Sequence, residues 1–211
     1  MKIALFLGIA CIVLLPKHAL SQIYVEPLAG YQKDLNNKRS YFLNTGLRAA
    51  FRFKNYELLV QAQKSWPQSL NYTDSSFTAN TALPLYSPAE EQLRTSSYSF
   101  AIGNRFKVAG RKTKNSFFIS MYTGVMIQKT TVNYTYDKTN YIVLNPDQTR
   151  SFTGPFFSAG LEYMREIKGG RLFAELNFST PPAVKQSYPS SFGPAAPASL
   201  NIGYSIKISK R

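Results

Sequence analysis

The chain has 211 residues, a formal net charge of +14, 14% aromatic residues, one cysteine and one histidine. This length suits one domain, and no apolar run is long enough to form a membrane-spanning helix, which needs about 18 residues or more.

The N-terminal stretch has the pattern of a secretory signal peptide. Lys2 precedes an apolar run at residues 3–15, and the small residues Ala19 and Ser21 occupy the positions that a signal peptidase requires. We therefore predict a signal peptide over residues 1–21. A retained N-terminal anchor is the alternative, but the apolar run is short for a bilayer.

Cleavage would remove both Cys11 and His18, which are the only cysteine and histidine. The remaining domain, residues 22–211, then has no disulfide, no imidazole metal ligand and no Ser-His or Cys-His catalytic pair. We expect no catalytic residue, no metal and no cofactor. Loss of Lys2 and Lys17 lowers the net charge to +12. This basic balance favours anionic lipid or acidic polymers, and nucleic acid is the least expected partner of a secreted chain.

Eight segments of the domain have strand-like composition. They are rich in aromatic, β-branched and glycine residues, lack helical spacing and are separated by turn residues. The predicted strands are residues 22–31, 41–53, 56–66, 96–107, 116–129, 152–167, 171–179 and 198–208. The connections alternate between longer and shorter, which is typical of an antiparallel membrane barrel that begins in the periplasm and has its long loops outside.

The long connections are expected to be loops. Pro67, Pro84 and Pro88, between the third and fourth predicted strands, should stop that stretch from extending the sheet. Tyrosines among serine, threonine and asparagine suit either a binding surface or mobile, solvated loops. These tyrosines are Tyr72, Tyr86, Tyr134, Tyr136, Tyr141 and Tyr188.

Alternate residues divide each strand into an apolar and a polar face. In the last strand, the apolar face is Leu200, Ile202, Tyr204, Ile206 and Ile208, and the polar face is Asn201, Gly203, Ser205 and Lys207. A soluble, lipocalin-like barrel would enclose the apolar faces instead.

Glycines distinguish these alternatives. The polar faces of six strands carry Gly30, Gly46, Gly103, Gly124, Gly160 and Gly203. A water-facing surface has no need of glycine, whereas the narrow lumen of eight strands requires small residues among large ones. We therefore predict an all-β fold, a closed antiparallel eight-stranded up-and-down transmembrane β-barrel with its polar face inside.

The polar face carries charges of both signs, and we predict that they pair as a network in the lumen. The predicted network is Glu26, Arg48, Arg52, Arg105, Glu162, Glu175 and Lys207, and Glu57 and Lys107 share its face. Buried charges are costly unless they are paired. Paired carboxylates for acid–base hydrolysis are the alternative, disfavoured by the many basic partners. Eight strands leave no room for an open channel.

Two further groups of residues collect near the strand ends. Basic residues expected at the inner rim, facing phospholipid headgroups or water, are Lys54, Arg111, Lys112, Lys114, Lys168, Arg171, Lys210 and Arg211. Expected aromatic girdles are Tyr31, Tyr41, Trp66, Tyr98 and Phe152 on the outer side and Phe53, Tyr56, Phe106, Phe117 and Tyr163 on the inner side.

With a signal peptide, eight two-faced strands and alternating loops, the whole domain resembles the small Gram-negative outer-membrane barrels of the OmpA/OmpX type. The ending Asn201-x-Gly203-x-x-Ile206-x-Ile208 resembles the C-terminal assembly signal of that class, with isoleucines where aromatics are usual. The resemblance implies outer-membrane lipid and the barrel-assembly machinery as partners, with an extracellular ligand or protein at the loops.

The function expected from this resemblance is a non-enzymatic integral outer-membrane barrel that presents extracellular loops. Its role would be structural in the envelope, adhesive or accessory to secretion. The alternatives are a secreted, soluble lipocalin-like barrel that binds a small apolar ligand, and an outer-membrane lipid-modifying enzyme.

Overall fold

The computed structural model describes residues 22–34, 41–53, 56–78, 80–110, 114–143, 148–180 and 197–208. The predicted signal peptide, residues 1–21, lies outside these described residues. Among them, no helix is long and apolar enough to cross a membrane.

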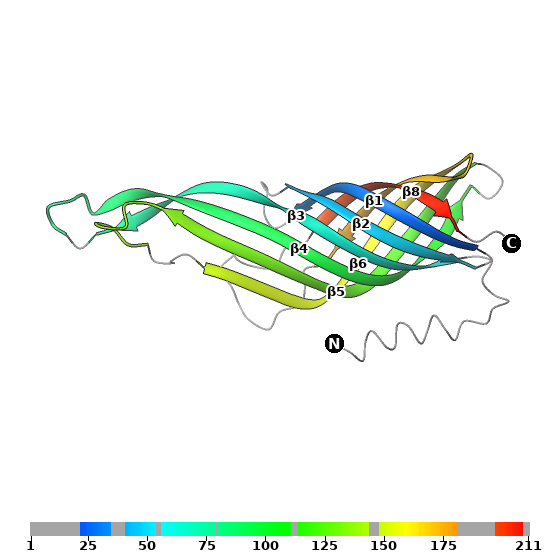
Figure 1. The fold of residues 1–211 in the computed structure, drawn as a ribbon, viewed down its shortest axis with the longest axis horizontal. Helices are drawn as coiled ribbons and strands as arrows, with labels where there is room; N and C mark the ends of the chain where they lie inside the picture. The colour runs from blue at the N-terminus through cyan, green and yellow to red at the C-terminus, as the bar shows by residue number, and fades with distance from the viewer. Residues whose placement is uncertain are drawn as a thin grey trace.

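Eight antiparallel strands, each hydrogen-bonded to its neighbours in sequence, form a closed barrel in which β1 also pairs with β8 (Figure 1). The strands are β1 (Gln22–Asp34), β2 (Tyr41–Arg52), β3 (Tyr56–Phe77), β4 (Tyr86–Ala109), β5 (Asn115–Thr135), β6 (Gln148–Ile167), β7 (Gly170–Ser179) and β8 (Pro197–Lys207). The predicted fold is therefore confirmed. Closure leaves no strand without two neighbours in the barrel wall, which a bilayer requires because it offers no water to unpaired backbone groups.

Alternate residues of each strand face outward and inward as predicted. In β5, for example, exposed and buried side chains alternate from Asn115 to Tyr122. Large apolar side chains such as Phe100, Leu161 and Ile202 are exposed, whereas Arg48 and Arg105 are fully buried. The alternative of a soluble, lipocalin-like barrel with its apolar faces inside is therefore wrong.

Strands β3 to β6 continue far beyond the barrel, and this corrects the prediction of loops. Residues 68–77 of β3 pair with residues 86–95 of β4, and β4 from Glu90 pairs with β5 as far as Thr135. Figure 1 shows these strands running past the short strands β1, β2, β7 and β8. We call residues 68–77, 86–95, 128–135 and 148–151 the extension. At about 3.3 Å per residue, ten residues of strand reach roughly 30 Å.

The prolines do not prevent this pairing. Pro67 lies in a register shift between Ser65 and Gln68, and Pro88 pairs with Ser75 beyond the point where β5 begins to pair with β4. A bulge and an edge position are the two places where a strand tolerates the missing N–H of proline. Pro84 lies in the turn of this hairpin, as predicted.

Pro27 lies inside β1 without a register shift. The β1–β8 ladder omits pairs at Glu26 and Pro27 and resumes at Leu28 in the same register. Proline has no N–H to donate, so pairing with β8 is lost at this point, but the strand does not shift. The inward and outward faces of β1 therefore stay in phase on both sides of Pro27.

The extension has a small core of its own. Ala89, Leu93, Val132 and Tyr134 form a buried cluster on the face continuous with the lumen. The segment after β5 folds onto this sheet, since Ile142 pairs with Phe77 and the Tyr141 hydroxyl donates to the Pro84 carbonyl at 3.2 Å. The predicted loop tyrosines Tyr134 and Tyr141 are accordingly buried, and Tyr188 lies outside the described residues.

Candidate functional site

The outward surface changes chemistry midway along the long strands. On β4 the exposed outward residues between Tyr98 and Val108 are large and apolar, and on β5 the same holds between Phe117 and Val125 except at Thr123. We call this outward zone the apolar belt. Its length of about 9–11 residues is what a tilted strand needs to cross a bilayer.

Beyond the belt, the outward face of the extension is polar. Its exposed residues include Glu90, Gln92, Arg94, Lys129, Asn133 and Thr135. Because the same strands continue from apolar to polar outward residues, the membrane boundary lies within β3 to β6 rather than at their ends.

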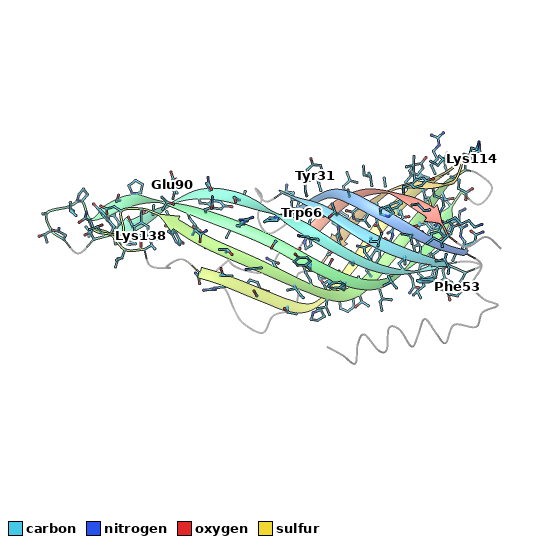
Figure 2. All side chains as sticks on the ribbon, in the orientation of Figure 1. Tyr31, Phe53, Trp66, Glu90, Lys114 and Lys138 are labelled. Atoms are coloured by element: carbon cyan, nitrogen blue, oxygen red, sulfur yellow. The ribbon has the colours of Figure 1, made fainter. Side chains whose placement is uncertain are left out.

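Aromatic rings mark both borders of the belt. At one border, the Lys64 ammonium lies 4.0 Å from the Trp66 ring centroid and 5.4 Å from that of Tyr98. At the other, Phe53 stacks on Tyr56 at 4.7 Å. Figure 2 shows Trp66 midway along the molecule and Phe53 at the end opposite the extension.

The two predicted girdles need two corrections. Phe53, on the inner side, stacks on Tyr56 and is buried, at 8% exposed. Phe152 points inward and is only 3% exposed, because it shares the inward parity of Phe156 on β6. Tyr31 and Tyr98 are exposed as predicted. On the inner side, the ring centroids of Phe117 and Tyr163 are 5.3 Å apart. The side chain of Tyr41 lies outside the described residues.

Inside the barrel, Arg48 on β2 binds three carboxylates. Its Nε donates to Glu26 Oε2 at 2.6 Å, its Nη2 to Glu162 Oε2 at 2.9 Å and its Nη1 to Glu175 Oε2 at 3.0 Å. The Tyr122 hydroxyl accepts from Arg48 Nη1 at 2.6 Å and donates to Glu175 at 2.8 Å. All three carboxylates are almost fully buried.

Arg105 on β4 binds a second, overlapping set. Its Nη2 and Nη1 donate to Glu26 Oε1 and Glu162 Oε1, both at 2.6 Å, and its Nε donates to Glu57 Oε2 at 2.7 Å. Arg171 donates to Glu57 Oε1 at 2.8 Å and to Glu26 Oε1 at 3.3 Å. The arginines thus share their carboxylates, and the ion pairs form one network.

Four carboxylates and four guanidinium groups make up this network, which we call the charged layer. Its members are Glu26, Glu57, Glu162, Glu175, Arg48, Arg52, Arg105 and Arg171. The formal charges cancel, and aromatic rings lie against the arginines, with Arg171 3.7 Å from the Tyr24 centroid and Arg48 4.6 Å from that of Phe173. Paired and hydrogen-bonded charges are the form in which ionised groups are tolerated in a low-dielectric interior.

Two basic residues lie elsewhere than the sequence analysis placed them. Lys207 is exposed near the end of β8, and no ion pair among the described residues includes it. Arg171, expected at the inner rim, is 3% exposed and inside the layer. Arg171, Glu175 and Asn177 share one parity on β7, and that signal could have placed Arg171 in the lumen.

Some of the other predicted sites fall where expected. In the predicted assembly signal, Asn201 is buried and Gly203 faces inward, while Ile206 and Ile208 are exposed outward. Lys114 and Lys168 are exposed at the end with the short turns, whereas Lys54, Arg111, Lys112, Lys210 and Arg211 lie outside the described residues.

Above the charged layer, towards the long connections, the lumen contains a small hollow of about 30 Å³, which is partly open to solvent. We call it the vestibule. Its lining comes from every strand except β2 and contains amides, hydroxyls and a few apolar groups, but no charged side chain. Alternation along the strands places these residues inward but does not indicate where side chains leave space, so the vestibule could not be predicted from the sequence.

Several buried amide atoms in this part of the lumen have no partner. They are Gln61 Oε1, Asn177 Oδ1 and both polar atoms of the Asn44 side chain. Gln61 and Asn177 line the vestibule. A buried amide without a partner is unusual, since most such groups bind protein or water.

The charged layer offers no free carboxylate for acid–base chemistry. Each of its four glutamates accepts from at least one arginine. No group of three or more metal-ligating side chains occurs in the described part of the chain.

No family model matches the sequence, and no curated protein matches it either. Among solved structures, a major outer membrane protein from Thermus thermophilus superposes with a TM-score of 0.51 at 11% identity, over 89% of this chain and 98% of that one. The chain therefore has the fold of an outer-membrane β-barrel.

Other outer-membrane proteins superpose at lower scores. The attachment invasion locus protein Ail of Yersinia pestis, solved with the heparin analogue sucrose octasulfate, has a TM-score of 0.49 at 12% identity, over 89% of this chain and 97% of that one. The Neisserial surface protein A has a TM-score of 0.46 at 9% identity, over 88% of this chain and 96% of that one.

Proposed function

We propose that this outer-membrane β-barrel is a non-enzymatic display protein, which holds the extension outside the cell for a structural, adhesive or secretion-accessory role. The observation that carries the proposal is the change of the outward surface within β3 to β6. The strands leave the apolar belt and continue as a polar sheet with its own buried cluster of Ala89, Leu93, Val132 and Tyr134. A sheet ordered in water beyond the membrane is suited to presenting a surface.

The proposed orientation places the first residues of β1 in the periplasm. β1 begins, and β8 ends, at the end where strands are joined by short turns such as that between Ile167 and Gly170. The extension lies at the opposite end (Figure 1). Short periplasmic turns and long extracellular connections are the usual arrangement in such barrels.

A lipid-modifying enzyme is the weaker alternative. The one histidine of the chain, His18, lies within the predicted signal peptide. The buried glutamates, the other candidates for acid–base work, are bound by arginines. The display role also agrees with the expected partners, which are outer-membrane lipid around the belt, the assembly machinery at β8 and an extracellular ligand or protein at the extension.

Orientation can be tested by cysteine labelling of intact cells. We would introduce Asn133→Cys, exposed on the extension, and separately Lys168→Cys, exposed in a short turn. A membrane-impermeant maleimide should label Asn133→Cys in intact cells and Lys168→Cys only after permeabilisation. The opposite pattern would contradict the proposed orientation.

The display role can be tested by shortening the extension. Replacing residues 69–94 with a two-residue turn retains the Gln68–Thr95 pair and the whole apolar belt. The shortened protein should still migrate differently in boiled and unboiled gel samples, as a closed barrel does. It should lose adhesion of expressing cells to host cells or matrix, or secretion of a co-expressed substrate. If neither changes, the extension does not have the proposed role.

A further inference from the structure

Two polar side chains interrupt the apolar belt on neighbouring strands. Asn104 has the outward parity of Ile102 on β4, and Thr123 has that of Met121 on β5. In the ladder between these strands, Asn104 is opposite Met121 and Ile102 is opposite Thr123. The two polar residues are therefore diagonal neighbours on the lipid-facing surface. We call Asn104 and Thr123 the polar pair.

The amide of Asn104 lies too deep in the belt to reach lipid headgroups. At about 3.3 Å per residue, Asn104 is roughly 20 Å along β4 from Tyr98 and roughly 13 Å from Val108, the two ends of the belt on this strand. A strand tilt of about 40° shortens the corresponding depths by about a quarter. Both depths still exceed the reach of an asparagine side chain, which is shorter than the lysine and arginine side chains that extend to headgroups.

Neither member of the polar pair has a hydrogen bond from its side chain to any described residue. By contrast, the outward hydroxyl of Thr45, near a border of the belt, accepts from Trp66 Nε1 at 3.0 Å. Lipid tails offer neither donors nor acceptors, so an unpaired amide among them costs free energy. A protein partner at this face would recover that free energy.

A second copy of the chain supplies a matching partner. An amide both donates and accepts, so two Asn104 side chains can exchange hydrogen bonds. Every copy of the barrel crosses the membrane in the same direction, and Asn104 therefore lies at the same depth in each copy. A two-fold axis along the bilayer normal brings the two amides together, and such a contact closes with two copies.

The side chains around the polar pair are apolar and exposed, with Ile102 45% and Met121 57% exposed. Lipid tails solvate such side chains about as well as protein does, so apolar contact alone gives little reason for two barrels to associate at this face. The polar pair gives that reason, because its hydrogen bonds form only in the associated state.

We propose that the barrel forms a two-fold dimer in the membrane through the outward face of β4 and β5, with the two Asn104 amides hydrogen-bonded to each other and Thr123 beside them. This inference depends on the belt lying in a bilayer and not on the proposed display role. Failure of the adhesion test would leave it standing.

Association can be measured by energy transfer between copies of the full barrel in phosphatidylcholine vesicles. Donor and acceptor dyes would be attached at Lys168→Cys, which is exposed in a short turn. Energy transfer should exceed that of randomly distributed barrels and should fall when unlabelled barrel is added.

Variants of the polar pair test the contact itself. Asn104→Leu removes the amide at similar size and should raise the dissociation constant about threefold to tenfold for each hydrogen bond lost. Asn133→Leu, exposed on the extension, is the matched control and should leave the constant unchanged. If Asn104→Leu does not fold, as judged by heat-modifiable migration, Thr123→Val removes the neighbouring hydroxyl at the same shape and should also weaken association.

Disulfide trapping in membranes of expressing cells locates the interface. Residues 22–211 contain no cysteine, so an introduced thiol is the only one in this part of the chain. Asn104→Cys places it at the proposed axis, and copper phenanthroline should convert the protein into a disulfide-linked dimer. Ile202→Cys, equally exposed in the belt but on β8, is the control and should stay monomeric.

Three results would overturn the proposal. The first is energy transfer no greater than that of randomly distributed barrels at every ratio of protein to lipid. The second is a folded Asn104→Leu or Thr123→Val protein that associates as strongly as the unaltered barrel. The third is that Asn104→Cys is trapped as a dimer no more than Ile202→Cys, or is joined only to other proteins, which would assign this face to a different partner.

Discussion

Arg105 holds the charged layer together, because one guanidinium serves three glutamates on three other strands. Its donors reach Glu26 on β1, Glu57 on β3 and Glu162 on β6. Glu57 lies opposite Arg105 on the neighbouring strand, but β1 and β6 are not neighbours of β4, so the contacts with Glu26 and Glu162 are cross-links through the lumen. Because Arg105 is fully buried, its ion pairs are not screened by water as surface pairs are.

Arg105→Met should therefore destabilise the barrel strongly. Removal of one partner from a buried ion pair typically costs about 3–5 kcal/mol, since the remaining charges stay buried without compensation. The urea midpoint for unfolding from detergent micelles should fall. Arg94→Met, on the exposed outward face of the extension, is the matched control and should change little. Equal midpoints for the two variants would contradict a stabilising role of the charged layer.

At the residue scale, Glu91 gives the extension a dependence on pH. Glu91 lies on the face continuous with the lumen, opposite Tyr72 on β3 and Tyr134 on β5. Partial burial, together with the negative charge of nearby Asp74, raises the pKa of this carboxyl above its usual 4.5. The folded extension thus favours the protonated form.

The sign of the effect follows from linkage. The extension should be most stable below the unfolded pKa, and its stability should fall as the pH rises through the folded pKa of Glu91. Hydrogen exchange of extension amides, corrected for intrinsic rates, should show less protection at about pH 7 than at about pH 4. Glu91→Gln should reduce this difference, and Glu90→Gln, on the exposed face, is the control. If protection in Glu91→Gln still differs between the two pH values by the same amount, a titrating group other than Glu91 causes the difference.

At the element scale, one strand contains both a membrane-crossing and a water-exposed half. On β4, Phe100 lies in the apolar belt and Gln92 on the polar outward face, and both are exposed side chains in the isolated protein. Their environments differ only if a bilayer surrounds the belt. Position along the strand therefore decides the cost of a charge.

Phe100→Arg should make the free energy of folding into lipid vesicles less favourable. The loss should be about 2–4 kcal/mol if the residue lies near the midplane of the bilayer. Gln92→Arg should fold as the unaltered protein does. The measurement is the equilibrium between urea-unfolded and vesicle-inserted protein. Similar folding of both variants would place the belt outside the membrane.

Strand β8 closes the barrel against β1 and β7 and carries the predicted assembly signal. A Cβ at Gly203 would lie 2.3 Å from Cζ of Phe173 and 2.5 Å from the Pro27 carbonyl oxygen, so no larger residue fits. Ile206 faces outward in the belt, where a carboxylate would meet lipid.

Gly203→Arg and Ile206→Asp should both lower the amount of folded protein in the outer membrane and raise the amount of periplasmic degradation products. Asn133→Arg and Asn133→Asp, exposed on the extension, are the matched controls. The measurement is fractionation followed by comparison of boiled and unboiled gel samples. Normal levels of both β8 variants would show that β8 does not have the predicted assembly role.

At the scale of the whole molecule, the barrel has a closed wall, a lumen blocked at one level and a hollow at another. The charged layer crosses the lumen with side chains that, except for the partly exposed Arg52, are almost entirely buried, which leaves no water-filled path at that level among the described residues. The vestibule above it is open to solvent.

The purified barrel should therefore show no stable porin-like conductance in planar bilayers, since eight strands filled by side chains leave no channel. The inward-facing glycines Gly46 and Gly124 do not open a path either, because a Cβ at each would contact backbone at under 3.0 Å. Recordings with steady conductance at the level of a general porin would contradict a filled lumen.

Local alternation in the sequence was enough to determine the barrel and the contents of its two faces. A period of two is set by the backbone itself, so inward Arg48 and outward Phe100 follow from position alone. The extent of the strands depended on tertiary structure. Residues 68–95 resemble a loop in composition, and their pairing relies on Leu93 and Val132 meeting across two strands. The vestibule likewise forms only where side chains from seven strands fail to fill the lumen, because free space is a property of the closed barrel and not of any one strand.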